Sequence, residues 1–127
     1  APAPPPGPKS YAAQIKAGKD ALMNGQVSKA MRLFEAAVRQ RPGSADALAG
    51  MGWGYINLKK PHVAVVKFRQ ALGANSRHGD AYIGLGKAFR MMSKPREAAD
   101  AYRKYLELHP KGPKATIAKN AIETLSP

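Results

Sequence analysis

The sequence repeats itself with a period of 34 residues, and this period limits the folds that the chain can adopt. One glycine recurs in three copies, at Gly18, Gly52 and Gly86. An alanine and an aromatic residue keep the same register, in the columns Ala30, Ala64 and Ala98, and then Phe34, Phe68 and Tyr102. Columns that share one register across three copies indicate internal repeats. The repeats are residues 11–44, 45–78 and 79–112.

Each repeat carries the apolar spacing of two α-helices. In the second repeat the apolar positions that follow this spacing are Leu48, Met51, Tyr55, Leu58, Val65, Phe68 and Leu72. Pro61 and Pro95 suit the first turn of the second helices, where a backbone N–H has no helical partner. We expect Ser10 and Ser44 to cap the first helices, because a serine hydroxyl can accept a hydrogen bond from such an N–H.

The recurring glycine lies inside each first helix, where glycine costs about 1 kcal/mol relative to alanine. Its recurrence therefore indicates a close approach between helices. We expect the glycine to let the recurring alanine of the second helix approach. We expect the aromatic residue of the Phe34 column to fill the space between neighbouring repeats.

This pattern resembles the tetratricopeptide repeat family. The third repeat carries most of the family motif, at Tyr82, Leu85, Gly86, Phe89, Ala98, Tyr102 and Pro110. It departs from the motif at Tyr105, the second repeat departs from it at Ser76, and the first helix of the first repeat lacks the large aromatic residues of the motif. The resemblance implies an all-α fold, a right-handed superhelical solenoid of three helix–turn–helix repeats.

The two ends of the chain differ from the repeats. Residues 1–9 hold five prolines, a composition that favours extended structure and forms no core. We interpret them as a disordered linker, with a natural N-terminal tail as the alternative. In residues 113–127, one helical face carries Ile117, Ala121, Ile122 and Leu125. A solenoid exposes its last apolar face unless a cap covers it, so we predict a C-terminal capping helix and tail. The alternative is the first helix of a fourth repeat.

The composition argues against several functional classes. The chain has 21 Lys and Arg against 8 Asp and Glu, a net charge of +13 that favours an acidic partner. It has no cysteine, which excludes disulfides and Cys-ligated metals. The three histidines, which we expect at the surface, are His62, His78 and His109, and no two have the i, i+4 spacing of a helical metal site. We predict that the chain is not an enzyme and binds no metal or cofactor.

The apolar runs of the sequence are short. None approaches the about 20 residues that a bilayer-spanning helix needs, so we predict no transmembrane segment. We expect a cytoplasmic location, and a periplasmic one stays open.

In the family that the sequence resembles, the first helices of successive repeats line a concave groove. The groove positions that we expect to bind a partner are Ile15, Lys19, Leu22, Met23, Ala49, Trp53, Ile56, Asn57, Ile83, Lys87, Arg90 and Met91. Trp53 is the only tryptophan, and the small residues Ala49 and Gly50 beside it predict a recess for a partner's side chain. Two alternatives remain: Trp53 packs between first helices, and Met23 and Met91 fill the core.

One subset of this family binds the C-terminal carboxylate of chaperones through a clamp of Asn, Lys and Arg side chains. Here the two clamp Asn positions hold Lys19 and Gly50, and the clamp Lys and Arg positions of the third repeat hold Asp80 and Gly84. We therefore predict no binding of this kind.

The second helices form the convex side of the family's fold, and here they are basic, with Arg32, Arg39, Lys67 and Arg69. We predict a non-catalytic protein–protein interaction module whose groove binds an acidic or mixed apolar and acidic peptide or protein, and which recruits it for a larger parent protein. The alternative is a basic adaptor that binds nucleic acid or another polyanion through the convex face. Nucleic acid is disfavoured because no aromatic residues alternate with the basic ones to stack on bases. Self-association is a third possibility.

Overall fold

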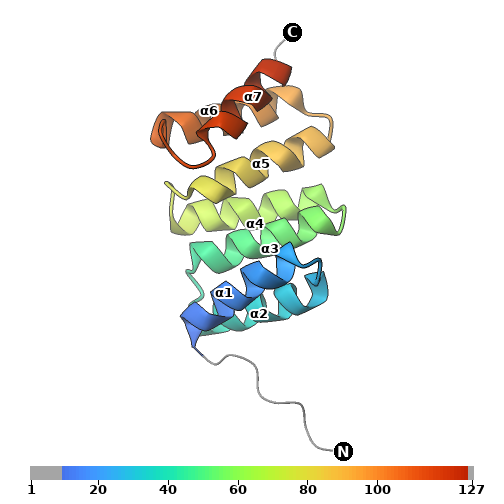
Figure 1. Ribbon diagram of the computed structural model, residues 1–127, viewed down its shortest axis with the longest axis vertical. Coiled ribbons are helices and arrows are strands. Elements are labelled where there is room, and N and C mark those ends of the chain that lie inside the picture. Colours follow the sequence, from blue (N-terminus) through green and yellow to red (C-terminus); the bar gives the residue numbers. More distant parts are fainter. Residues whose placement is uncertain (1–9, 126–127) are drawn as a thin grey trace, which may run out of the picture.

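The computed structural model describes residues 10–125, and within this range it contains seven α-helices and no strand (Figure 1). The helices are α1 Tyr11–Met23, α2 Val27–Gln40, α3 Ala45–Asn57, α4 Pro61–Ala74, α5 Gly79–Met91, α6 Pro95–Leu108 and α7 Ala115–Leu125. The predicted linker at residues 1–9 and the last two residues of the predicted tail lie outside the described residues.

The helices form three successive hairpins and one additional helix. α1 packs on α2, α3 on α4 and α5 on α6, while α7 packs on α6 at the C-terminal end of the stack (Figure 1). α3 also contacts both α1 and α5, so the first helices of the three hairpins form one continuous layer. This arrangement confirms the prediction of an all-α solenoid of three repeats with a capping helix.

The helix starts follow the predicted capping chemistry. The side chains of Ser10 and Ser44 accept hydrogen bonds from the backbone N–H groups of Ala13 and Ala47, as expected for N-cap serines. At the start of α5 the same position of the repeat holds His78, whose Nδ1 accepts from the Ala81 N–H at 3.2 Å. Pro61 and Pro95 begin α4 and α6, as predicted.

The turn inside each hairpin has the same left-handed backbone conformation in all three repeats. Gly25, Lys59 and Ser93 have φ angles of 75°, 60° and 58°, and they lie 34 residues apart. The N–H groups of the next residues bond back five positions, for example from Lys60 to the Tyr55 carbonyl at 2.9 Å. Only glycine adopts this conformation without cost, so Lys59 and Ser93 each hold about 1 kcal/mol of strain that the repeat geometry maintains.

The glycines of the first helices accommodate aromatic rings of the second helices. Phe34 and Phe68 are fully buried. A Cβ atom added at Gly18 would lie within 3 Å of the Phe34 ring, and one added at Gly52 or Gly84 would lie equally close to the Phe68 ring. The close approach that the glycine column predicts is therefore present, and the nearest atoms to these glycines belong to the aromatic rings of the second helices.

Candidate partner-binding groove

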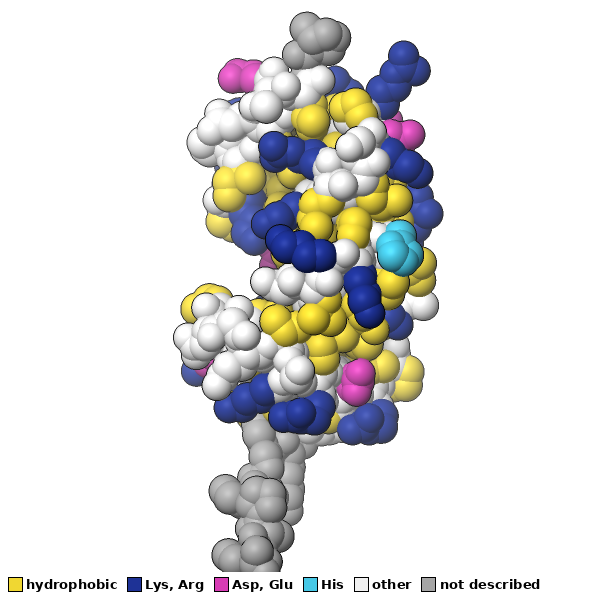
Figure 2. Space-filling model, turned by 90° about the vertical axis from the view of Figure 1, so that its right-hand side faces the viewer, with side chains coloured by type: hydrophobic (Ala, Val, Ile, Leu, Met, Phe, Trp, Pro, Cys, Tyr) yellow, Lys and Arg dark blue, Asp and Glu magenta, His cyan; other side chains and the backbone are white. Residues whose placement is uncertain are grey.

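Two adjoining cavities open along the layer of first helices. The first, the N-terminal cavity, has a volume of about 340 Å³ and is lined by Lys19, Leu22, Met23, Asp46, Ala49, Gly50, Trp53, Asn57, His78, Asp80 and Lys114. The second, the C-terminal cavity, has a volume of about 590 Å³ and is lined by Trp53, Ile83, Lys87, Arg90, Met91, Tyr102, Lys114 and Ile117. Trp53 and Lys114 belong to both linings. Figure 2 shows one edge of the molecule hollowed at mid-height, with Lys and Arg side chains along the upper margin of the hollow.

Trp53 belongs to both the packed layer and the groove. Its ring meets the buried Phe68 ring edge to face, with centroids 5.6 Å apart and planes at 77°. The same ring is only partly buried and has two cations beside it, because the Nζ atoms of Lys114 and Lys87 lie 5.5 and 6.0 Å from its centroid. The Trp53 ring therefore packs on a residue of a second helix, Phe68 of α4, and also lines both cavities.

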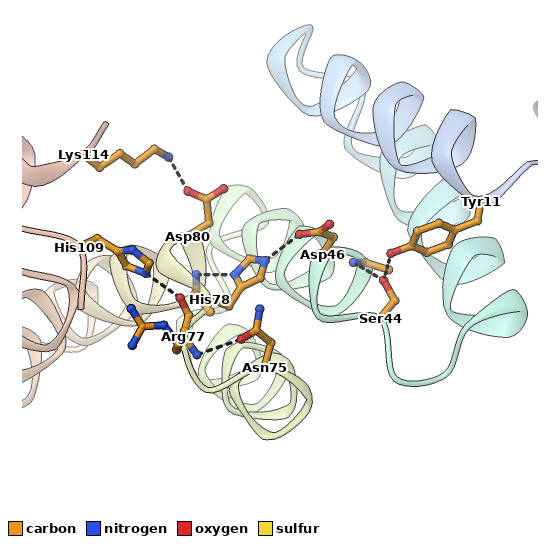
Figure 3. A network of polar contacts seen from close by, with 11 residues as sticks. Tyr11, Ser44, Asp46, Asn75, Arg77, His78, Asp80, His109 and Lys114 are labelled. Carbon is orange, nitrogen blue, oxygen red and sulfur yellow. Dashed lines mark hydrogen bonds and ion pairs between the residues drawn. The ribbon is translucent and has the colours of Figure 1, made fainter. Parts of the chain in front are cut away.

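Lys114 is held in the groove by residues of two helices, α5 and α6. It lies just before α7, and its backbone N–H donates to the Tyr105 hydroxyl at 3.0 Å. Its Nζ forms an ion pair with the Asp80 carboxylate at 3.2 Å (Figure 3). Because both ends of Lys114 have partners, its charge is held close to the Trp53 ring.

The N-terminal cavity contains two carboxylates, and each already has a partner (Figure 3). Asp80 pairs with Lys114, and Asp46 accepts a hydrogen bond from His78 Nε2 at 2.8 Å. The donor is Nε2 because Nδ1 accepts from the Ala81 N–H, which assigns the ring proton to Nε2. His78 is thus a half-buried N-cap rather than the surface residue that the sequence predicted.

The cations of the groove have fewer ion-pair partners than its carboxylates. Lys19, Lys87 and Arg90 are exposed, and none of the ion pairs found within residues 10–125 involves them. The C-terminal cavity is lined by three cations and no carboxylate, whereas the N-terminal cavity has two cations and two carboxylates. The positive potential of the groove is therefore concentrated between α5 and α7.

The structure places most of the predicted groove residues in the two cavities, but not all of them. Ile15 and Ile56 are 8% and 4% exposed and line neither cavity, because they face the core of the helix layer. Met23 is 82% exposed and Met91 is also exposed, so the alternative that these methionines fill the core is wrong. Ala49 and Gly50 do line the N-terminal cavity beside Trp53.

Three residues that line the C-terminal cavity were not predicted from the sequence. Lys114 and Ile117 come from the capping segment, and Tyr102 comes from α6. Ile117 was expected on the packed face of the capping helix, yet it is 54% exposed while Ala115, Ala118 and Ala121 are buried there. The helical spacing of these alanines indicates that they form the packed face of α7. This spacing could have predicted that Ile117 lies on another face, toward the groove.

The predicted basic face lies on α2 and α4. Arg32, Arg39 and Arg69 are exposed and Lys67 is half-buried. Within the described residues, no ion pair involves any of the four. The Arg69 guanidinium lies 5.8 Å from the Phe89 ring centroid.

Among residues 10–125, no cluster of three or more His, Cys, Asp or Glu side chains could hold a metal ion. The described helices are also too short or too polar to cross a membrane.

The fold and the open groove define a helical-repeat module, and the family follows from comparison with known proteins. The chain belongs to the tetratricopeptide repeat family, whose model matches residues 15–53 and 50–113. The modules of this family are non-catalytic and mediate protein interactions, and this chain is one of them.

Three solved structures show the same fold. The Arabidopsis OM64 TPR domain is 22% identical, with a TM-score of 0.80 over 91% of this chain and 93% of that one. The Yersinia enterocolitica type III secretion translocator chaperone SycD is 12% identical, with a TM-score of 0.83 over 91% and 90%. The second TPR domain of human RPAP3, in complex with the HSP70 peptide SGPTIEEVD, is 18% identical, with a TM-score of 0.76 over 91% and 98%.

Proposed function

We propose that the concave groove binds a short segment of a partner protein that combines apolar and acidic side chains, and that the module recruits this partner for a larger parent protein. The observation that carries this proposal is the pair of adjoining cavities with Trp53 and Lys114 between them. The structural relative from human RPAP3 was solved with a peptide that contains acidic and apolar residues, which supports a peptide as the class of ligand.

The residues of the groove suit such a ligand chemically. Tryptophan is among the residue types that contribute most to binding energy at protein interfaces. The exposed Met23 and Met91 offer flexible apolar surface that adapts to different side chains. Lys87 and Arg90 add cations that can pair with a ligand carboxylate at the edge of the apolar surface.

The binding mode differs from the chaperone carboxylate clamp, which we predict to be absent. Two of the four positions that would form the clamp hold glycine, and an added Cβ at Gly50 or Gly84 would collide with the Phe34 or Phe68 ring. A third position holds Asp80, whose negative charge opposes a ligand carboxylate. Titration with a chaperone C-terminal peptide should therefore detect no micromolar binding.

The proposal is tested by selecting ligands from displayed random short peptides and measuring their affinity by calorimetry. We expect the selected peptides to combine acidic and apolar residues, and we expect Trp53→Ala to weaken them by about 2 kcal/mol or more, which is about thirtyfold. Leu58→Ala is the matched control, because Leu58 follows α3 and is 46% exposed but lines neither cavity. Circular dichroism verifies that each variant is folded.

The basic face on α2 and α4 provides the competing outcome. If the selected ligands lose all affinity when Arg39, Lys67 and Arg69 are reversed to Glu, and none when Trp53 is replaced, the groove is not the binding site. Binding to a polyanion would also collapse as salt rises, because each neutralised phosphate releases a counterion.

Light scattering across concentration tests self-association. The cytoplasmic location remains a prediction.

A further inference from the structure

The two cavities of the groove differ in charge although they share Trp53. Lys87, Arg90 and Lys114 line the C-terminal cavity without a carboxylate among them. Asp46 and Asp80 line the N-terminal cavity together with Lys19 and Lys114. A ligand side chain therefore meets an excess of positive charge on one side of the Trp53 ring and balanced charges on the other.

We propose that the groove selects a charge-polarised segment, with its acidic side chain in the C-terminal cavity and an uncharged apolar side chain in the N-terminal cavity. This inference rests on the proposed function, which it sharpens by assigning each chemical group of the ligand to its own cavity. The segment crosses the Trp53 ring between the two positions.

The C-terminal cavity has the donors that a carboxylate needs and the apolar surface that its methylene groups need. Lys87 and Arg90 have no ion-pair partner within the described residues, so a ligand carboxylate displaces no internal acid from them. Ile83, Met91 and Ile117 contribute the apolar part of the lining. The exposed position of Ile117 is significant because it leaves apolar surface beside the cations.

The N-terminal cavity disfavours a second acid. The Asp80 carboxylate already engages Lys114 at 3.2 Å, so a ligand acid would compete with it for that ammonium group, which leaves Lys19 as the one cation of this cavity without an ion pair within residues 10–125. Asp46 adds a second negative charge, and its partner His78 is neutral by its hydrogen-bonding pattern. Leu22, Met23 and Ala49 instead offer apolar contacts.

The capping segment is in this view part of the binding site. Lys114 and Ile117 supply one wall of the acid-binding cavity, and Tyr105 fixes the backbone of Lys114 through its hydroxyl. Asp80 is a positioning residue, since it holds the Lys114 ammonium near Trp53.

The test uses peptides selected from a random display library on the wild-type chain, and then measures them by calorimetry against charge-reversal variants. We expect the selected motif to group its acidic residues on one side of its apolar residues. Lys87→Glu combined with Arg90→Glu should weaken these peptides about tenfold or more, because it places like charges together. Lys19→Glu, in the other cavity, should weaken them less than about threefold, as should Lys111→Glu, which is exposed and outside both cavities.

A double-mutant cycle then locates the ligand's acid. When the acidic residues of the peptide are replaced by their amides, the reversal of Lys87 and Arg90 should no longer change the affinity, whereas the effect of Trp53→Ala should persist. Equal sensitivity to Lys19→Glu, or a selected motif with acids on both sides, overturns the assignment of cavities but leaves the groove as the binding site. Retained affinity in Trp53→Ala overturns the proposed function itself.

Discussion

Phe68 and Trp53 contact each other edge to face, yet their surroundings are opposite. Phe68 belongs to an aromatic column that recurs in every repeat, its ring is fully buried, and Gly52 and Gly84 leave the space that the ring fills. Trp53 is only partly buried and has two lysines beside its ring. In the repeat register Trp53 corresponds to Lys19 and Lys87, so its column does not keep one residue type. The contrast teaches that residues repeated through the chain build the solenoid, while a residue that breaks the repeat shapes the groove.

The largest expected effect is the loss of the buried ring. Phe68→Ala should reduce the free energy of unfolding by about 3–5 kcal/mol, because it removes a large apolar side chain and leaves a cavity between two hairpins. Chemical denaturation measures the loss. Leu72→Ala, which truncates a partly buried side chain of the same helix, should cost clearly less. Equal losses would contradict the special role of the aromatic column.

The next effect reverses the usual preference of helices for alanine over glycine. Gly84→Ala should reduce the free energy of unfolding by about 1–3 kcal/mol, because the new Cβ meets the fully buried Phe68 ring. Gly73→Ala is the matched control within a helix, since nothing lies within 4 Å of its added Cβ. That variant should be more stable than the wild type by about 0.5–1 kcal/mol. Thermal unfolding measures whether each variant is less or more stable than the wild type.

A third experiment replaces Trp53 with lysine, the residue that the first and third repeats have at the same position. Trp53→Lys should reduce the free energy of unfolding by about 1 kcal/mol, mainly through the lost ring contact with Phe68. It should abolish binding of the selected peptides. Denaturation and calorimetry on the same preparation separate the two effects. A loss of stability as large as that of Phe68→Ala would show that Trp53 belongs to the structural residues after all.

The smallest effect is expected on the basic face. Reversing Arg39 and Arg69 to Glu should change the affinity of groove ligands less than about threefold at physiological salt, because exposed charges distant from the ligand are screened. At low salt the same variant should associate more slowly, since long-range steering is then stronger. Stopped-flow kinetics at two salt concentrations measures this difference, and a salt-independent loss would argue for direct contact at these arginines.

The internal repeat made the fold predictable, because the same pattern recurs in three copies and each copy supports the helix assignment of the others. The hairpins, the serine caps and the prolines at helix starts all follow from local rules that act within about one turn of helix. The same register also indicates a third N-cap position. His78 lies 34 residues after Ser44, and this correspondence points to its capping role.

The groove was less predictable because it depends on how separate helices are oriented. Ile15 and Ile56 were assigned to it by position, but the packing of the first helices turns both side chains into the core. Lys114 and Ile117 lie outside the repeat register, so no equivalent residue indicated their direction. The spacing of the α7 alanines indicates which face of α7 is buried, but the place of the opposite face in the C-terminal cavity depends on how α7 packs on α6, a tertiary contact that local spacing does not specify.

Because Lys114 and Ile117 line the C-terminal cavity, they restrict where further hairpins can be added to this fold without changing the binding site. Inserting a further hairpin between α6 and α7 would move both side chains one unit away from Trp53 and open the acid-binding cavity on one side. Lengthening ahead of α1 would leave that cavity untouched. Hairpins added before α1 should therefore leave the ligand preference unchanged, whereas hairpins added between α6 and α7 should change it. Chimeras that exchange hairpins between such proteins should transfer α5, α6 and α7 as a single block.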